Sequence, residues 1–136
     1  MEKQLTLVNK IEQIPQLAEF VEQICEELGL DVAMNFNLNL VLEEAVTNVI
    51  MYAFPQGEEH TFTLKAWTEG NKLVFELRDQ GKPFNPIESA PEVDTTLSAD
   101  EREIGGLGIF LIQKIMDEVS YQYEGQSNIL TMVKVI

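Results

Sequence analysis

The sequence has only one cysteine and one histidine, and it has no long apolar run. A single cysteine, Cys25, cannot form an internal disulfide, which fits a reducing compartment. No run approaches the roughly 20 apolar residues of a membrane span, and the first residues, MEKQLTLVNK, lack the apolar stretch of a signal peptide. These absences favour a cytoplasmic protein that does not enter a membrane.

Basic residues are also scarce. Nine lysines and arginines stand against 23 acidic residues, and the formal net charge is −14. Such a field repels nucleic acid, so direct nucleic-acid binding is not expected. An anionic ligand such as a nucleotide would need a metal ion and backbone donors. The acidity suits a basic protein partner, and a merely soluble surface explains it equally well.

The chain is long enough for one domain with a core of its own, and we expect a single domain over residues 1–136. Hydrophobic residues make up 45% of it, a globular composition. Apolar periodicity predicts, in order, a strand, two helices, a hairpin, an irregular stretch, a helix and two strands. Their ranges are 3–9, 14–29, from within 35–40 to about 52 or 53, 60–79, 81–104, 107–119, 120–125 and 128–136.

Several details accompany this assignment. Pro15 suits the first turn of the first helix and Gly29 its exit, with Cys25 in the core row. The asparagines of NFNLNL are expected to cap the second helix. His60 is expected to be an exposed turn residue. The element order predicts an α+β fold, a two-layer α/β sandwich in which helices cover one face of a mixed, mostly antiparallel sheet.

The second helix carries polar residues at the border of its apolar stripe. At about 100° per residue, Glu44 and Asn48 lie one turn apart at the same edge of the stripe, whereas Glu43 points away. We call the surface formed by Glu44 and Asn48 the polar ledge. An amide oxygen beside a carboxylate suits Mg²⁺ when phosphates and water complete the shell. Taken alone, the spacing is equally typical of solvated residues at a helix border.

Two glycine-containing segments offer further candidates. In RDQGKPFNP, Asp79 leaves a strand end, where its carboxylate could accept a hydrogen bond from an exocyclic amine such as that of adenine. Gly81 then allows a close backbone approach, although the segment could be only a turn. In GGLGIFLI, glycines enter an apolar helix whose N-terminus suits phosphate, unless they form only a hinge.

Together, EEAVTNVIMYAF, RDQGKPFNP and GGLGIFLIQKIMDEVSY resemble the histidine-kinase-like ATPase superfamily with the Bergerat nucleotide fold. The closer resemblance, over nearly the whole chain, is to small bacterial anti-sigma factors that are also serine/threonine kinases. It implies ATP and Mg²⁺ as cofactors. It also implies a sigma factor and an anti-anti-sigma antagonist as partners, and a homodimer.

The resemblance also implies roles for individual residues. Asn48 would coordinate Mg²⁺, and Glu44 would be the general base, or an orienting group, for the attacking hydroxyl. Asp79 would bind the adenine amine, with Gly81 allowing close approach. Phosphates would be held beneath a lid of about residues 86–104. The remaining nucleotide-binding candidates are Gly106, Leu107, Gly108, Thr131 and, as the one arginine of the lid, Arg102.

Two functions of different classes remain open. One is an enzyme that phosphorylates an antagonist; the other is a nucleotide-responsive binding module of partner switching that transfers no phosphate. The presence of Glu44 beside Asn48 favours the enzyme, and the acidic composition of the lid weakens the case for turnover. A complete sensor histidine kinase is not expected, because no histidine lies on a dimerisation helix.

Overall fold

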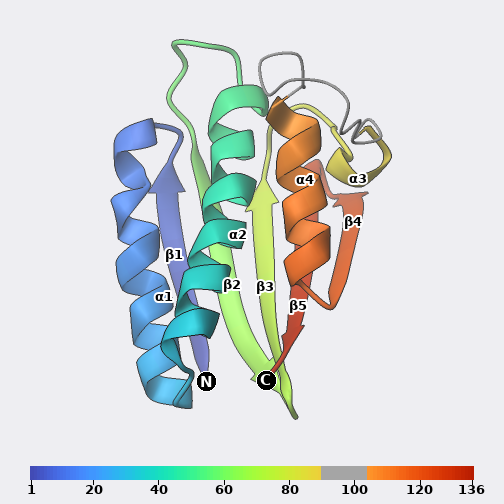
Figure 1. Cartoon of the computed structure of the whole chain (residues 1–136). Helices are drawn as coiled ribbons and strands as arrows, with labels where there is room; N and C mark the ends of the chain where they lie inside the picture. The colour runs from blue at the N-terminus through green and yellow to red at the C-terminus, as the bar shows by residue number, and fades with distance from the viewer. Residues whose placement is uncertain (90–103) are drawn as a thin grey trace.

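The computed structural model describes residues 1–89 and 104–136, and of residues 88, 89 and 104–107 only the backbone. Two layers are evident, with helices packed on one face of a sheet (Figure 1). The strands are β1 (Glu2–Val8), β2 (Thr61–Glu69), β3 (Lys72–Asp79), β4 (Glu118–Glu124) and β5 (Ser127–Val135). The helices are η1 (Ile11–Gln13), α1 (Pro15–Leu28), α2 (Val32–Tyr52), α3 (Pro86–Ser89) and α4 (Ile104–Ile115). The predicted α+β sandwich is confirmed.

The sheet has the strand order β1-β2-β3-β5-β4. All four pairings are antiparallel, so the expectation of a mixed sheet is wrong within the part of the chain described. The long connection between β3 and β4 lets α4 cross the sheet, and β4 then joins the edge beyond β5. As a result, the end of β3 lies beside the beginning of β5, where Asp79 pairs with Asn128.

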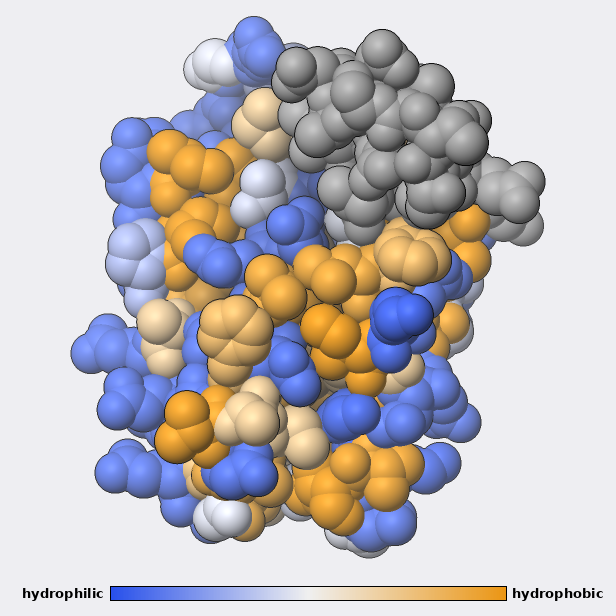
Figure 2. Space-filling view, in the orientation of Figure 1, coloured by the Kyte–Doolittle hydropathy of each residue, from blue (hydrophilic) through white to orange (hydrophobic). Residues whose placement is uncertain are grey.

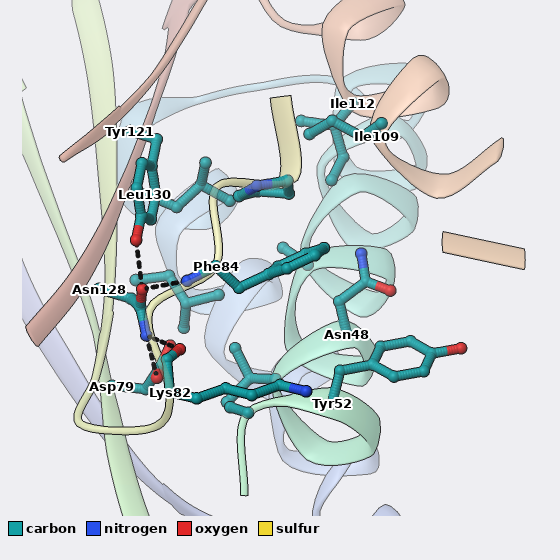
Figure 3. A pocket seen from close by; sticks show the side chains of 15 residues that line it. Asn48, Tyr52, Asp79, Lys82, Phe84, Ile109, Ile112, Tyr121, Asn128 and Leu130 are labelled. Atoms are coloured by element: carbon teal, nitrogen blue, oxygen red, sulfur yellow. Dashed lines mark hydrogen bonds between the residues drawn. The ribbon is translucent and has the colours of Figure 1, made fainter. Parts of the chain in front are cut away.

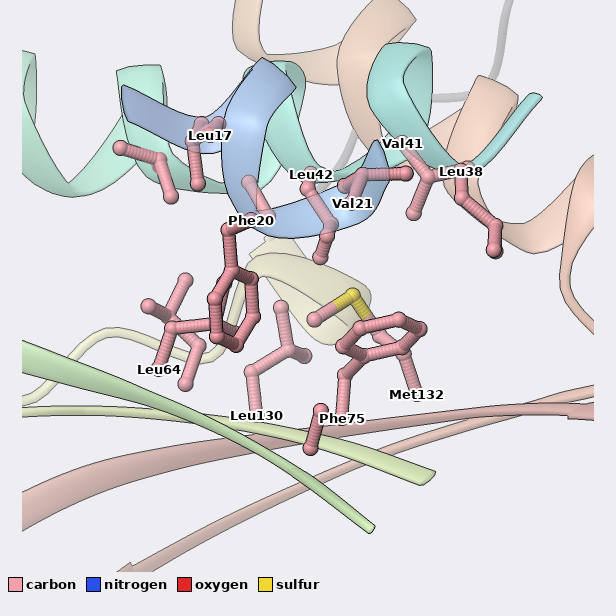
Figure 4. Packing of buried hydrophobic residues seen from close by; sticks show 14 of the residues in the cluster. Leu17, Phe20, Val21, Leu38, Val41, Leu42, Leu64, Phe75, Leu130 and Met132 are labelled. Carbon is pink, nitrogen blue, oxygen red and sulfur yellow. The ribbon is translucent and has the colours of Figure 1, made fainter. Parts of the chain in front are cut away.

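The core lies between the sheet and α1, α2 and α4, and the face on which these helices lie carries both hydrophilic and hydrophobic side chains (Figure 2). Figure 4 shows Phe20 of α1 and Leu42 of α2 above Phe75 and Met132 of the sheet. The inward residues of the predicted hairpin are all buried, as alternation requires. Cys25 is 3% exposed, and burial raises the pKa of its thiol, so its structural role is confirmed.

Helix boundaries confirm some predictions and correct others. Pro15 begins α1, and Gly29 ends it in the left-handed conformation at φ 67°. The cap of α2 is Asp31, whose Oδ1 accepts from the Met34 N–H at 2.9 Å. The prediction of an asparagine cap is therefore wrong: Asn35 and Asn39 lie inside the helix and hydrogen-bond each other one turn apart. Among the described residues, no helix is long and apolar enough to cross a membrane.

Later segments also shift. Helix α4 spans residues 104–115 rather than 107–119, because the chain is already extended in β4 from Glu118. Of the predicted lid, only α3 and Ile104 are described, and residues 90–103, with Arg102, lie outside the described residues. His60 is less exposed than predicted, since its ring stacks on Phe54 with centroids 4.4 Å apart. Its Nε2 also lies 2.9 Å from a Glu58 carboxylate oxygen.

Candidate functional site

The polar ledge of α2 faces the neighbouring helix α4. Glu43 is exposed, whereas Glu44 and Asn48 are half-buried. A Cβ atom added to Gly108 of α4 would lie 2.8 Å from Glu44 Oε2 and 3.6 Å from Asn48 Nδ2. The structure therefore brings Glu44, Asn48 and Gly108 together. No described residue forms a hydrogen bond or ion pair with either ledge side chain, so their polar atoms are available to a ligand.

Asn48 also lines a cavity between α2, α4 and the ends of three strands (Figure 3). Its empty space is about 540 Å³, with open solvent at the mouth included. The walls are mostly apolar. The lining residues are Ala45, Asn48, Val49, Tyr52, Ala53, Leu77, Asp79, Lys82, Phe84, Pro86, Ile109, Ile112, Tyr121, Asn128 and Leu130.

Asp79 is the buried carboxylate of this cavity, at 6% exposure. Burial raises its pKa, and hydrogen bonds from the Asn128 side chain and the Gly81 backbone partly oppose that rise. Both donors reach Oδ1, at 3.0 Å from Asn128 Nδ2 and 2.9 Å from Gly81 N. No described residue donates to Oδ2. An apolar cavity with one unsatisfied carboxylate oxygen suits a ligand that carries an amine on a flat apolar ring.

Gly81 has a packing reason to be glycine besides the predicted close approach to a ligand. A Cβ there would lie 2.3 Å from the backbone oxygen of Ala53, at the end of α2. That oxygen accepts a hydrogen bond from the Lys82 N–H at 3.0 Å. Gly81 thus permits a close approach of the turn to α2, and this approach positions the cavity wall.

The structure does not bring Thr131 to the cavity. Thr131 pairs with Glu76 and Ser120, whereas Asn128, Leu130 and Met132 pair with the residues that face the helices. Because side chains alternate along a strand, Thr131 lies on the opposite face of the sheet. The nearby polar residue on the correct face is Asn128, which sequence reasoning missed; only the β3–β5 register reveals it.

The glycine segment begins helix α4. Gly106 and Leu107 lie among the first four residues of this helix, whose N–H groups have no partner within a helix. Gly108 is one position further and contacts the ledge. Gly106 and Leu107 therefore remain candidates for phosphate through their backbone.

The donor set at the ledge bears on a metal. The described residues contain no group of three or more histidine, cysteine or acidic side chains that could hold a metal ion. A metal here would therefore depend on Asn48 and on oxygens supplied by the ligand and water. That pattern fits Mg²⁺, which retains waters and uses few protein ligands when phosphates are present.

Comparison with known proteins places this site in context. Residues 7–134 match the family described as "Histidine kinase-like ATPase domain". The serine-protein kinase RsbW of Listeria monocytogenes is 30% identical over 130 residues, covering 88% of this chain and 83% of the relative. An anti-sigma F factor of Thermoanaerobacter is 32% identical over 101 residues, covering 74% of this chain and 69% of the relative.

Solved structures share the fold. The chain superimposes on part of a solved structure that contains the RsbU and RsbW domains of a Mycobacterium tuberculosis protein, with a TM-score of 0.71 at 12% identity. That match covers 99% of this chain and 32% of the solved one. The histidine kinase AdeS of Acinetobacter baumannii gives a TM-score of 0.51 at 12% identity, covering 96% and 67%. At this identity the likeness concerns the fold alone.

Proposed function

The chain belongs to the histidine kinase-like ATPase domain family, and on that premise we propose that it is an ATP-binding anti-sigma factor with serine/threonine kinase activity. Its protein substrate is an anti-anti-sigma antagonist. The observation that carries the proposal is that two polar groups on α2 meet Gly108 of α4 beside a cavity containing buried Asp79. The relatives named as a serine-protein kinase and an anti-sigma factor support the same reading.

The arrangement suggests how the residues divide the work. Asp79 Oδ2 accepts a hydrogen bond from the adenine amine, and the apolar walls cover the faces of the base. The phosphates extend toward Asn48 and the first turn of α4. Mg²⁺, when bound, neutralises phosphate charge, and the Asn48 amide oxygen would help to hold it.

Glu44 is then placed to act on the protein substrate. Its carboxylate accepts the proton of the attacking hydroxyl and orients that oxygen toward the terminal phosphate. Because phosphoryl transfer depends mainly on positioning and charge stabilisation, residues held by a packed helix are well suited to it. Glu43 cannot do this, since it is exposed away from the ledge.

The proposal includes three features that come from the resemblance. They are capture of a sigma factor, a homodimer and a cytoplasmic location. In this scheme the acidic chain binds its sigma factor until the unphosphorylated antagonist displaces it, and phosphorylation of the antagonist reverses the exchange. Size-exclusion chromatography with light scattering measures the mass of the protein alone and tests the dimer.

The kinase test uses ATP labelled at the γ-phosphate, Mg²⁺ and a purified anti-anti-sigma antagonist domain. Wild type is expected to label the antagonist on serine or threonine. Glu44→Gln should retain nucleotide binding and lose transfer by about 100-fold or more, the usual effect of removing a general base. Asn48→Ala should weaken both binding and transfer.

Glu43→Gln is the matched control, because it removes the same charge one residue away, and it should transfer like wild type. Equal transfer by Glu44→Gln would remove Glu44 from its role. Tight ATP binding by wild type without any labelled antagonist would favour the nucleotide-responsive binding module.

A further inference from the structure

Asn128 uses both ends of its side-chain amide inside the protein. Its Nδ2 donates to Asp79 Oδ1 at 3.0 Å and to the Lys82 carbonyl at 2.9 Å. Its Oδ1 accepts from the Phe84 N–H at 3.1 Å and from the Tyr121 hydroxyl. Figure 3 shows this cluster at one end of the cavity. Asn128 is 6% exposed, so these contacts replace nearly all of its hydration.

Three of these contacts, with Asp79, Lys82 and the Phe84 N–H, determine which way the amide points. In the opposite orientation, the amide nitrogen would face the Phe84 N–H, which can only donate. The amide oxygen would then face the Asp79 carboxylate and the Lys82 carbonyl, so all three contacts would become unfavourable. The Tyr121 hydroxyl can donate or accept, and here it donates to Oδ1 and adds one hydrogen bond that holds the amide in place.

This orientation determines what Asp79 offers to a ligand. Because Asn128 and Gly81 both donate to Oδ1, the rotation of the carboxylate is fixed and Oδ1 already accepts two hydrogen bonds. Oδ2 is the oxygen for which the described residues supply no donor. While the carboxylate is ionised, Oδ2 accepts hydrogen bonds and cannot donate one.

We propose that Asn128 and Tyr121 are positioning residues for base selection, an inference that rests on the proposed nucleotide binding. The Tyr121 hydroxyl holds the Asn128 amide in place, and Asn128 holds Asp79 as an acceptor toward the base. The site then takes a purine with a 6-amino donor and rejects one with a 6-oxo acceptor. A site built around a hydrogen bond to the ligand discriminates strongly, because the mismatched ligand leaves a buried polar atom unpaired.

The test compares ADP with inosine diphosphate, which replaces the 6-amino group by a 6-oxo group. Isothermal titration calorimetry without metal gives both affinities for wild type, Tyr121→Phe and Tyr123→Phe. Tyr121→Phe removes one hydroxyl and keeps the apolar ring in the cavity wall. Tyr123, two residues along β4, is 46% exposed and does not line the cavity, so Tyr123→Phe is the control.

Wild type and Tyr123→Phe should prefer ADP by the same factor. In Tyr121→Phe that factor should fall about three- to tenfold, the effect of one hydrogen bond. A residue with only a structural role would lower both affinities equally, so an unchanged ADP preference in Tyr121→Phe overturns the inference. Equal binding of both nucleotides by wild type also overturns it. Absence of binding of either nucleotide to wild type contradicts the proposed function instead.

Asn128→Asp provides a second, independent variant. It replaces the amine that faces Asp79 by a carboxyl oxygen, so the pair would share a proton or repel. The ADP affinity of Asn128→Asp should fall as the pH rises from about 6 to about 8, relative to the wild-type affinity at each pH. Parallel pH profiles for the two proteins would overturn the role of Asn128. Circular dichroism at each pH confirms that the variant is folded.

Discussion

At the scale of single residues, burial and hydrogen bonding have opposite effects on the charge of Asp79. Burial disfavours its charged form, whereas the two donors at Oδ1 favour it, and the net effect is a raised pKa. A carboxylate oxygen buried without a partner is costly to the folded state. A bound purine amine would relieve that cost, which links the energetics of this residue to its proposed ligand.

The raised pKa gives a prediction of defined sign. A carboxyl whose pKa is higher in the folded protein stabilises it below the ordinary value of 3.8. That contribution is lost as the pH rises through the raised pKa. Asp79→Asn cannot ionise, so its free energy of unfolding should increase relative to wild type as the pH rises from the ordinary value of 3.8 through the raised pKa.

Urea unfolding across this range measures the difference. Glu22→Gln, which removes one exposed charge on α1, corrects for the change in net charge. A gap between Asp79→Asn and wild type that stays constant or narrows with rising pH would show that burial does not control this carboxyl.

At the scale of elements, α2 combines a buried stripe with the polar ledge. Its apolar residues pack on the sheet and fix its rotation, and this rotation presents Glu44 and Asn48 to α4. The ledge could be predicted from the sequence because helical spacing is a local property. The start of the helix could not, since asparagine can cap a helix or lie within it.

The cap of α2 is directly testable. Asp31→Ala removes the acceptor of the Met34 N–H and should lower the free energy of unfolding by about 0.5–2 kcal/mol. Asn37→Ala lies inside the helix and should change stability little or raise it slightly, because alanine has the higher helix propensity. Thermal unfolding of both variants distinguishes the two positions, and equal losses would contradict Asp31 as the cap.

At the scale of the whole molecule, the fold class followed from the order of helices and strands, but the complete site did not follow. Asp79 was predicted from its place after a strand and before a glycine turn. Asn128 was not, because it joins the site only through pairing with a strand 49 residues away in sequence. The sequence predicted Thr131 as the nucleotide-binding residue of this strand, but strand alternation places it on the face of the sheet that points away from the cavity.

The net charge of −14 also acts on the whole molecule. Metal-free ATP should bind more tightly as NaCl rises from about 20 mM to about 300 mM, because salt screens repulsion between anions. Uncharged adenosine should show no such dependence. Fluorescence competition measures both affinities, and weaker ATP binding at high salt would indicate a local basic surface that outweighs the overall charge.

The pairing of Asp79 with Asn128 has a consequence for how the chain reaches its native state. If β3 and β5 slipped by two residues, every apolar side chain would keep its face, so the core discriminates poorly against that error. In the slip that brings Leu130 opposite Asp79, the buried acid would lose its amide and meet an aliphatic neighbour. A ligand stabilises only the form that it binds, so ATP would stabilise the chain with correctly aligned strands relative to the slipped one. ATP binding would therefore raise the fraction of correctly paired molecules.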